Sequence, residues 1–166
     1  MYTCTIKSNP IIKTNRLLLR QIVASDIDNI FKGLSHPDII KYYGVNFQTL
    51  EATKEQMKFY TDLEKNETGI WFAICSLDNC IFYGAGGLNS LSKEHKKAEI
   101  GFWLLPEYWG KGIATKALNE FLAHHNQVRP IYARVAKDNL GSRRVLAKCG
   151  FTVIGESKGF ANARGQ

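Results

Sequence analysis

The chain has 166 residues, of which 45% are hydrophobic and 11% aromatic, the composition of a globular protein that buries a core. No stretch approaches the roughly 20 apolar residues of a membrane-spanning helix, and residues 1–10 lack the apolar segment of a signal peptide. The net charge of +7 lies entirely in residues 111–166, which hold 10 Lys or Arg and 3 Asp or Glu. This bias fits a polyanionic partner, and it equally fits a solvated basic face.

The predicted elements alternate between strands and helices. Hydrophobic patterning predicts strands over residues 16–20, 70–75, 80–88, 97–105, 131–135 and 151–156. Helices are predicted over residues 24–35, 50–64, 112–125 and 139–148, with Ser25 as the first N-cap and His36-Pro37 as the stop. Glycines 84, 86 and 87 indicate a bulge or a close backbone approach. We find no repeat and no linker, so we expect a single domain over residues 1–166.

The four cysteines are scattered, without a Cys-x-x-Cys pair or a histidine at zinc spacing; they are Cys4, Cys75, Cys80 and Cys149. Reduced thiols in a cytoplasmic protein are the expectation, with no metal site and no disulfide framework.

Two glycines lie where the strand ending at residue 105 gives way to the next helix. The segment follows Pro106 and reads Trp109-Gly110-Lys111-Gly112-Ile113-Ala114. A helix N-terminus offers free backbone N–H groups and positive potential, and a missing Cβ lets an anion approach the backbone closely. The turn therefore suits a phosphate group, although on its own it is equally a tight connection without a ligand.

Two further motifs accompany this turn. One is Asn139-x-x-Ser142-x-x-Val145-Leu146-x-Lys148-x-Gly150-Phe151, and the other is Thr14-x-Arg16-Leu17-x-Leu19-Arg20. In this order the three motifs resemble the GNAT acetyltransferase superfamily, and more narrowly the branch that contains the ribosomal-protein-alanine N-acetyltransferases. The resemblance covers about residues 14–157. It implies a mixed α/β (α+β) fold, with a central, mostly antiparallel sheet and about four helices, that uses acetyl-CoA to acetylate a primary amine on a protein N-terminus or a small molecule.

The resemblance also assigns cofactor contacts. It implies that the acetyl-CoA pyrophosphate lies over Gly110, Lys111, Gly112, Ile113, Ala114 and Thr115. It implies that the backbone of Phe102, Trp103 and Leu104 pairs with the pantetheine amides and that Asn139 contacts the same arm. A core aromatic is the alternative for the Trp103 side chain, though not for its backbone. Asn139 is alternatively a plain N-cap, and it can have both roles. Trp109 stands where many superfamily members have Gln or Arg, which leaves phosphate binding to backbone N–H groups.

The chemistry requires a proton acceptor, because an amine attacks a thioester only in its neutral form. Glu99, which precedes Ile100-Gly101-Phe102, is the candidate base, and the alternative is an exposed carboxylate at a strand edge. Ser142 matches a position from which a hydroxyl donates to the CoA sulfur in many relatives, and the alternative is a role in the first turn of its helix.

The end of the sequence and the rival functions complete these expectations. Residues 159–166 look like the approach to one more strand, so we expect that the last strand is missing or that a second copy in a homodimer completes the amine pocket. We expect no membrane partner. A non-catalytic CoA-binding or sensor protein is the first alternative function, and a nucleic-acid-binding module is the less favoured one because the basic region has few aromatics outside apolar patterns.

Overall fold

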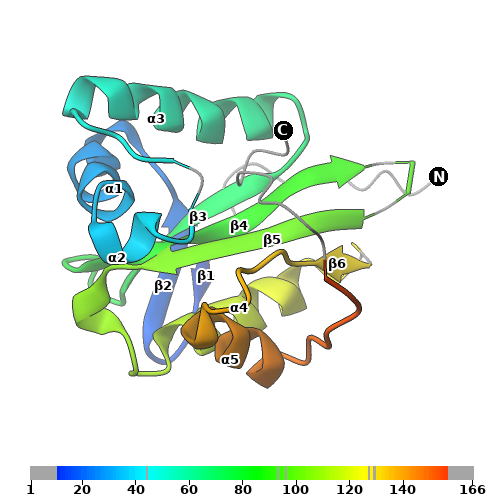
Figure 1. Cartoon of the computed structure of the whole chain (residues 1–166). Coiled ribbons are helices and arrows are strands. Elements are labelled where there is room, and N and C mark those ends of the chain that lie inside the picture. The colour runs from blue at the N-terminus through cyan, green and yellow to red at the C-terminus, as the bar shows by residue number, and fades with distance from the viewer. Residues whose placement is uncertain are drawn as a thin grey trace.

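The computed structural model describes residues 11–156 except residues 44, 93, 96, 127 and 129. Within these residues six strands form one sheet in chain order: β1 (Ile12–Lys13), β2 (Leu17–Gln21), β3 (Ile70–Ser76), β4 (Phe82–Ser92), β5 (Lys97–Leu104) and β6 (Ile131–Tyr132). Each pair of successive strands from β1 to β5 is antiparallel, and β6 pairs with β5 in parallel (Figure 1). The predicted mixed, mostly antiparallel sheet is confirmed.

Helices cover both faces of this sheet (Figure 1). One face carries α1 (Ile27–Leu34), α2 (Pro37–Ile40) and α3 (Leu50–Lys65), and the other carries α4 (Ile113–His124) and α5 (Leu140–Lys148). Two 3-10 turns, η1 (Ala24–Asp26) and η2 (Pro106–Tyr108), precede α1 and α4. Each face has its own apolar core, with Phe72, Ile100 and Phe121 in the α4 core and Trp71 and Trp103 in the α1–α3 core. The sheet is therefore buried on both sides.

The first helix begins differently from its prediction. Ser25 is not its cap; the buried Asp26 carboxylate accepts a hydrogen bond from the Val23 N–H at 2.8 Å and pairs with Arg20 at 2.8 Å. Because Arg20 lies on β2, this ion pair fixes the chain where it leaves the sheet, and the turn forms around Asp26. The predicted break at His36-Pro37 is confirmed, and the short helix α2 begins at Pro37.

The glycines of β4 mark a close approach of backbones, as predicted. A Cβ at Gly84 would collide with the Trp103 carbonyl, and one at Gly87 would collide with the Ile70 carbonyl. The β4–β5 register also shifts between Asn89 and Ser92, where Ser90 has a φ of 54°. One bulge therefore lies near the end of β4, and a second register shift, between Ile74 and Cys75 of β3, lies opposite Phe82 and Gly84 at the predicted place.

Both C-terminal strand predictions are wrong: one strand is shorter than predicted, and the other does not form among the described residues. β6 ends at Tyr132 rather than Val135, and residues 151–156 form no strand in the described part of the chain. Val153 and Ile154 remain 78% and 93% exposed. Apolar residues make a segment suitable for a strand, but a ladder also needs a neighbour, and two-residue β6 offers too little backbone to pair with. Residues 159–166, the expected approach to a last strand, lie outside the described residues.

A buried histidine, His125, follows the last residue of α4. His125 is 4% exposed, its ring lies 4.3 Å from that of Phe121, and its Nδ1 is 2.9 Å from the Phe121 carbonyl oxygen. Burial lowers the pKa of His125. The unfolded chain therefore binds a proton more readily than the folded one, and protonation favours unfolding.

We expect the free energy of unfolding to fall as pH drops below the ordinary histidine pKa of about 6.5. Urea unfolding between about pH 8 and pH 5 measures this dependence. His125→Gln should flatten that part of the profile, whereas replacing the exposed neighbour in His124→Gln, which removes only a smaller charge effect on His125, should change it much less. Equal slopes for the wild type and His125→Gln would contradict the assignment.

Candidate active site

The glycine turn leaves the N-terminus of α4 open. Gly110 and Gly112 have φ values of 74° and 77°, in the left-handed region that favours glycine, and Gly112 is the N-cap of α4. The first intrahelical bond runs from the Lys116 N–H to the Gly112 carbonyl. The N–H groups of the residues between them therefore have no acceptor within the helix; these are Ile113, Ala114 and Thr115. Free N–H groups at a helix N-terminus suit an anion, and the phosphate site at this turn stays a prediction.

Side chains add positive charge beside this turn. The Arg16 guanidinium donates to the Lys111 carbonyl at 3.1 Å, and the Lys111 ammonium lies 5.8 Å from the centre of the Tyr108 ring. Arg16 belongs to the first sequence motif, but its place at the α4 turn, 95 residues away along the chain, was not predicted. Arg16 and Lys111 meet only because the fold places the start of β2 beside the N-terminus of α4.

Beyond the end of β6, the edge of β5 has no strand neighbour among the described residues, and we call the space beside this edge the opening. The two strands pair only at Ala98–Ile131 and Glu99–Tyr132, and β5 continues to Leu104. The backbone N–H and C=O groups of successive residues point to opposite edges of a strand. The bond from the Leu105 N–H to the Tyr83 carbonyl shows that these groups point toward β4 at the odd-numbered residues of β5. Even-numbered residues face β6, as the bond from the Ala98 N–H to the Pro130 carbonyl shows. Past the end of β6, the backbone of Ile100, Phe102 and Leu104 therefore faces the opening.

This alternation divides the three residues predicted to pair with pantetheine. Phe102 and Leu104 present their backbone to the opening, whereas Trp103 pairs with Ala85 of β4 and its side chain is 4% exposed in the α1–α3 core. The prediction for the Trp103 backbone is wrong for this reason, and its core alternative holds. Trp109 caps the end of the strand, since its indole N–H donates to the Leu104 carbonyl at 2.8 Å.

Two adjacent tyrosines reach the two walls of the opening. The Tyr43 hydroxyl donates to the Phe102 carbonyl on β5 at 2.5 Å, and the Tyr42 hydroxyl lies 3.4 Å from the Asp138 carbonyl, next to α5. Burial raises the pKa of Tyr43 well above 10, so the phenol stays neutral and acts as a donor. No motif singled out either tyrosine, because the contacts join segments far apart in the sequence.

Asn139 and Ser142 form the start of α5. The Asn139 side-chain oxygen accepts a hydrogen bond from the Ser142 N–H at 3.2 Å, so the N-cap interpretation of Asn139 is confirmed. This bond leaves the Asn139 amide N–H groups available to a ligand. The Tyr42–Asp138 contact ties this helix start to the loop whose Tyr43 touches β5. Both predicted residues therefore lie near the opening.

Glu99 occupies the last paired position before β5 and β6 separate. It is 7% exposed, faces Asn89 on β4 and Tyr132 on β6, and its Oε2 accepts from Arg134 at 2.8 and 2.9 Å. Burial, and then the nearby Glu99 charge, raise the pKa of Tyr132. The exposed-edge alternative for Glu99 is thus wrong. The candidate base is a buried carboxylate that a guanidinium holds in place, and sequence reasoning missed Arg134.

A family model described as the acetyltransferase (GNAT) domain matches residues 16–152. The chain belongs to the GNAT acetyltransferase family. This GNAT protein is 32% identical over 146 residues to YoaA of Bacillus subtilis (strain 168), an uncharacterized N-acetyltransferase, and the match covers 86% of this chain and 82% of YoaA. The predicted acetyltransferase class is confirmed at the level of the family.

Solved structures share the fold. RimL, a ribosomal L7/L12 alpha-N-protein acetyltransferase in complex with coenzyme A, superposes with a TM-score of 0.78 at 21% identity, covering 88% of this chain and 86% of its own. A spermidine N-acetyltransferase from Vibrio cholerae, in complex with CoA and spermine, gives 0.75 at 22% identity, covering 86% and 84%. The ribosomal-protein-serine acetyltransferase of Escherichia coli (strain K12) is 29% identical over 111 residues, which are 65% of this chain and 61% of that protein. The predicted GNAT fold and ribosomal-protein branch are supported.

No described helix is long and apolar enough to cross a membrane. No group of three or more described His, Cys, Asp or Glu side chains is arranged to hold a metal ion.

Proposed function

We propose that this GNAT protein is a single-domain enzyme that transfers the acetyl group of acetyl-CoA to a primary amine. The observation that carries the proposal is the opening between β5 and β6, which runs from Glu99 toward the bare N-terminus of α4. The backbone N–H groups at this strand edge suit the amide carbonyls of pantetheine, and a helix N-terminus suits a pyrophosphate. The CoA complexes of RimL and the spermidine N-acetyltransferase, which share the fold, support this placement.

In this proposal the backbone of Phe102 and Leu104 binds the pantetheine arm, with the Asn139 amide beside it. The pyrophosphate lies against the turn made by Gly110, Lys111, Gly112, Ile113, Ala114 and Thr115. Arg16 adds charge at this end of the site. These contacts hold the thioester at the point where the strands separate, so positioning supplies much of the rate.

Glu99 is the proposed base. It lies on the sheet face that carries α1 and α3, opposite the core that packs against α4. An alkylammonium ion on this face loses one proton to Glu99 through water, and the neutral amine then attacks the thioester carbon. The tetrahedral intermediate releases the CoA thiolate, and the second proton on the nitrogen leaves as the thiolate is protonated. The Ser142 hydroxyl is the proposed proton donor to that thiolate. The acceptor belongs to one of two classes, a protein N-terminus or a small-molecule amine, in keeping with RimL and the spermidine enzyme.

An acetyl-CoA assay tests the function directly. The full chain is incubated with acetyl-CoA and panels of N-terminal peptides, polyamines and aminoglycosides, and free CoA thiol is measured. We expect thiol release above background with one class. CoA binding by calorimetry without thiol release for any amine would favour the alternative of a non-catalytic CoA sensor.

Tyr43 gives a sharper test of the opening. We expect Tyr43→Phe to lower turnover by about tenfold or more with little change in the KM for acetyl-CoA, because the ring still packs while the hydrogen bond that holds β5 at Phe102 is lost and the thioester is positioned less accurately. Tyr42→Phe is the matched variant, since it removes the longer contact to Asp138 from the same loop. Equal losses in the two variants would mean that the tyrosines only anchor the loop.

We also propose that the protein works in the cytoplasm as a homodimer. Its unbridged cysteines, the buried Cys75 and the half-buried Cys149, suit a reducing compartment. Analytical ultracentrifugation tests the dimer, and fractionation of the native cells tests the location.

A further inference from the structure

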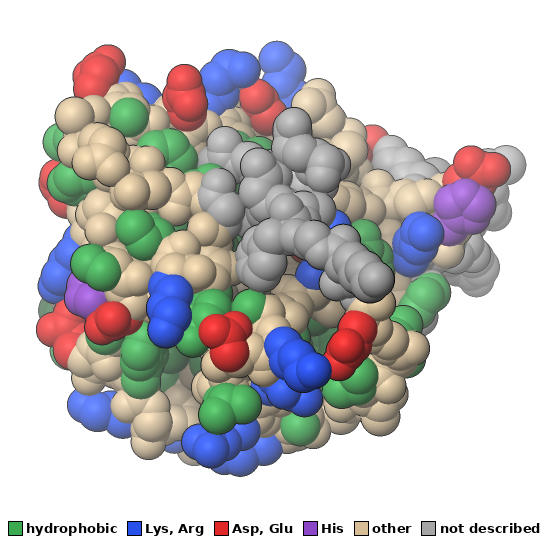
Figure 2. Space-filling view, viewed as in Figure 1, with side chains coloured by type: hydrophobic (Ala, Val, Ile, Leu, Met, Phe, Trp, Pro, Cys, Tyr) green, Lys and Arg blue, Asp and Glu red, His purple; other side chains and the backbone are tan. Residues whose placement is uncertain are grey.

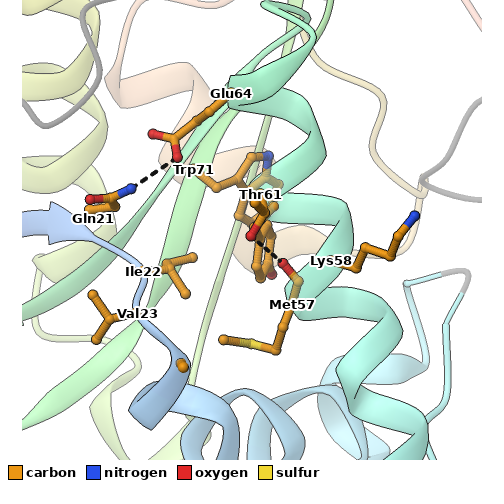
Figure 3. Close-up of a pocket in the computed structure, with 10 residues that line it drawn as sticks. Gln21, Ile22, Val23, Met57, Lys58, Thr61, Glu64 and Trp71 are labelled. Atoms are coloured by element: carbon orange, nitrogen blue, oxygen red, sulfur yellow. Dashed lines mark hydrogen bonds between the residues drawn. The ribbon is translucent and has the colours of Figure 1, made fainter.

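A cavity among the described residues lies apart from the opening, because it shares no lining residue with it. It has a volume of about 220 Å³ and lies between α3, the end of β2 and the start of η1 (Figure 3). Its lining mixes apolar side chains with a carboxylate, an amide and two aromatic rings; the main contributors are Gln21, Ile22, Met57, Tyr60, Glu64 and Trp71. At roughly 30 Å³ for each water molecule, it has room for about seven waters or for a short organic molecule.

One carboxylate oxygen at this cavity has an unmet hydrogen-bonding capacity. Glu64 Oε2 accepts a hydrogen bond from the Gln21 amide at 3.1 Å (Figure 3). Glu64 Oε1 is buried and has no hydrogen-bond partner within the described part of the chain. Leaving a buried charged acceptor without a donor is costly, so an ordered donor is expected beside it.

The remaining walls specify a positively charged donor. The rings of Tyr60 and Trp71 lie 5.4 Å apart, and aromatic faces attract organic cations. Lys58 also borders the cavity, but its ammonium pairs with Asp62 at 3.1 Å and points away in Figure 3. The cavity therefore combines a carboxylate, two aromatic rings and the Met57 thioether, and the lysine among its described lining residues is paired with Asp62 instead. We propose that it binds a small alkylammonium ion through Glu64.

This site is separate from the proposed transfer site and does not rest on the proposed function. The Trp71 ring forms the shared wall: a Cβ at Gly101 on β5 would lie 2.9 Å from it, and its indole N–H donates to Asn89 at 3.3 Å. Asn89 in turn faces Glu99 across the β4–β5 ladder. A cation in the cavity thus contacts a side chain that packs against the strand bearing the candidate base.

Calorimetric titration of the full chain with n-butylammonium chloride tests the proposal, with n-butanol as the neutral probe of similar shape. We expect saturable binding of the ammonium ion and binding of the alcohol weaker by about tenfold or more. Glu64→Gln should weaken ammonium binding by a similar factor, because the charge is lost while the shape is kept. Glu55→Gln, an exposed change on the same helix, should have no effect.

Two further variants separate the alternatives. Thr61→Arg changes an exposed position at the cavity rim, so it should place a fixed cation there and abolish binding. This variant tests the proposal even if the Glu64→Gln protein fails to fold. Glu99→Gln should leave binding intact. Equal affinity for butanol and butylammonium, unchanged affinity in Thr61→Arg, or loss of binding only in Glu99→Gln would each overturn the proposal.

Discussion

Gly112→Glu is expected to abolish binding of CoA to a folded protein. The substitution places a carboxylate at the N-terminus of α4, where the N–H groups of Ile113, Ala114 and Thr115 lack acceptors within the helix. The new side chain occupies the anion site with bulk and repels the pyrophosphate with charge. Calorimetric titration with CoA measures the loss.

The control must share the backbone strain of the substitution, because Gly112 has a φ of 77°. Gly112→Gln introduces the same strain and nearly the same volume without the charge, so its residual CoA affinity separates charge from bulk. Gly112→Ala tests strain alone, since its Cβ would meet only the Arg16 guanidinium, at 3.9 Å. CoA affinity at the wild-type level in a folded Gly112→Glu protein would sink the site assignment.

Glu99→Gln is expected to lower turnover by about 10²-fold or more while CoA affinity stays nearly unchanged. The amide cannot accept the proton of the attacking amine, yet it keeps the shape of a side chain that is 7% exposed. The loss should shrink as pH rises toward the amine pKa of about 10.4, because more of the acceptor arrives neutral. Steady-state rates across that range measure the effect.

Arg134→Gln provides the matched comparison. It breaks the same ion pair, at 2.8 Å in the wild type, but leaves the carboxylate in place. If Glu99 relays the proton, this variant should lose less activity than Glu99→Gln. Wild-type turnover of Glu99→Gln at neutral pH would remove Glu99 from the mechanism. Equal losses in both variants, with lowered thermal stability, would make the pair structural.

The cofactor half of the site could be predicted because its determinants are local. A positive φ at Gly112 and an N-cap at Asn139 depend on a few consecutive residues, and the sequence shows such residues directly. The prediction for Trp103 failed within the same stretch. A run of residues does not reveal which backbone groups a pleated strand turns toward its neighbour, and that depends on the register with β4.

The contacts of Tyr43 and Arg134 in the proposed site could not be predicted because the topology of the fold brings them together. Tyr43 meets Phe102 across 59 positions of sequence, and Arg134 meets Glu99 across 35. Neither side chain belongs to a motif, and each is placed by a loop whose path the hydrophobic pattern does not fix. The predicted strand over residues 151–156 failed for a related reason: its apolar residues were visible in the sequence, but the shortness of β6 was not.

Within the described part of the chain, β6 pairs with β5 over two residues, which leaves that edge of β5 without a strand neighbour along Ile100–Leu104. In the proposed complex the pantetheine arm takes the place of that neighbour, so the co-substrate also serves as part of the scaffold. A ligand that binds only the folded state stabilises it by mass action, about 2.7 kcal/mol at 100 times its Kd. The lifetime of this protein in the cell would then follow the supply of acetyl-CoA. When acetyl-CoA is scarce, the enzyme would lose both its substrate and part of its stability against unfolding.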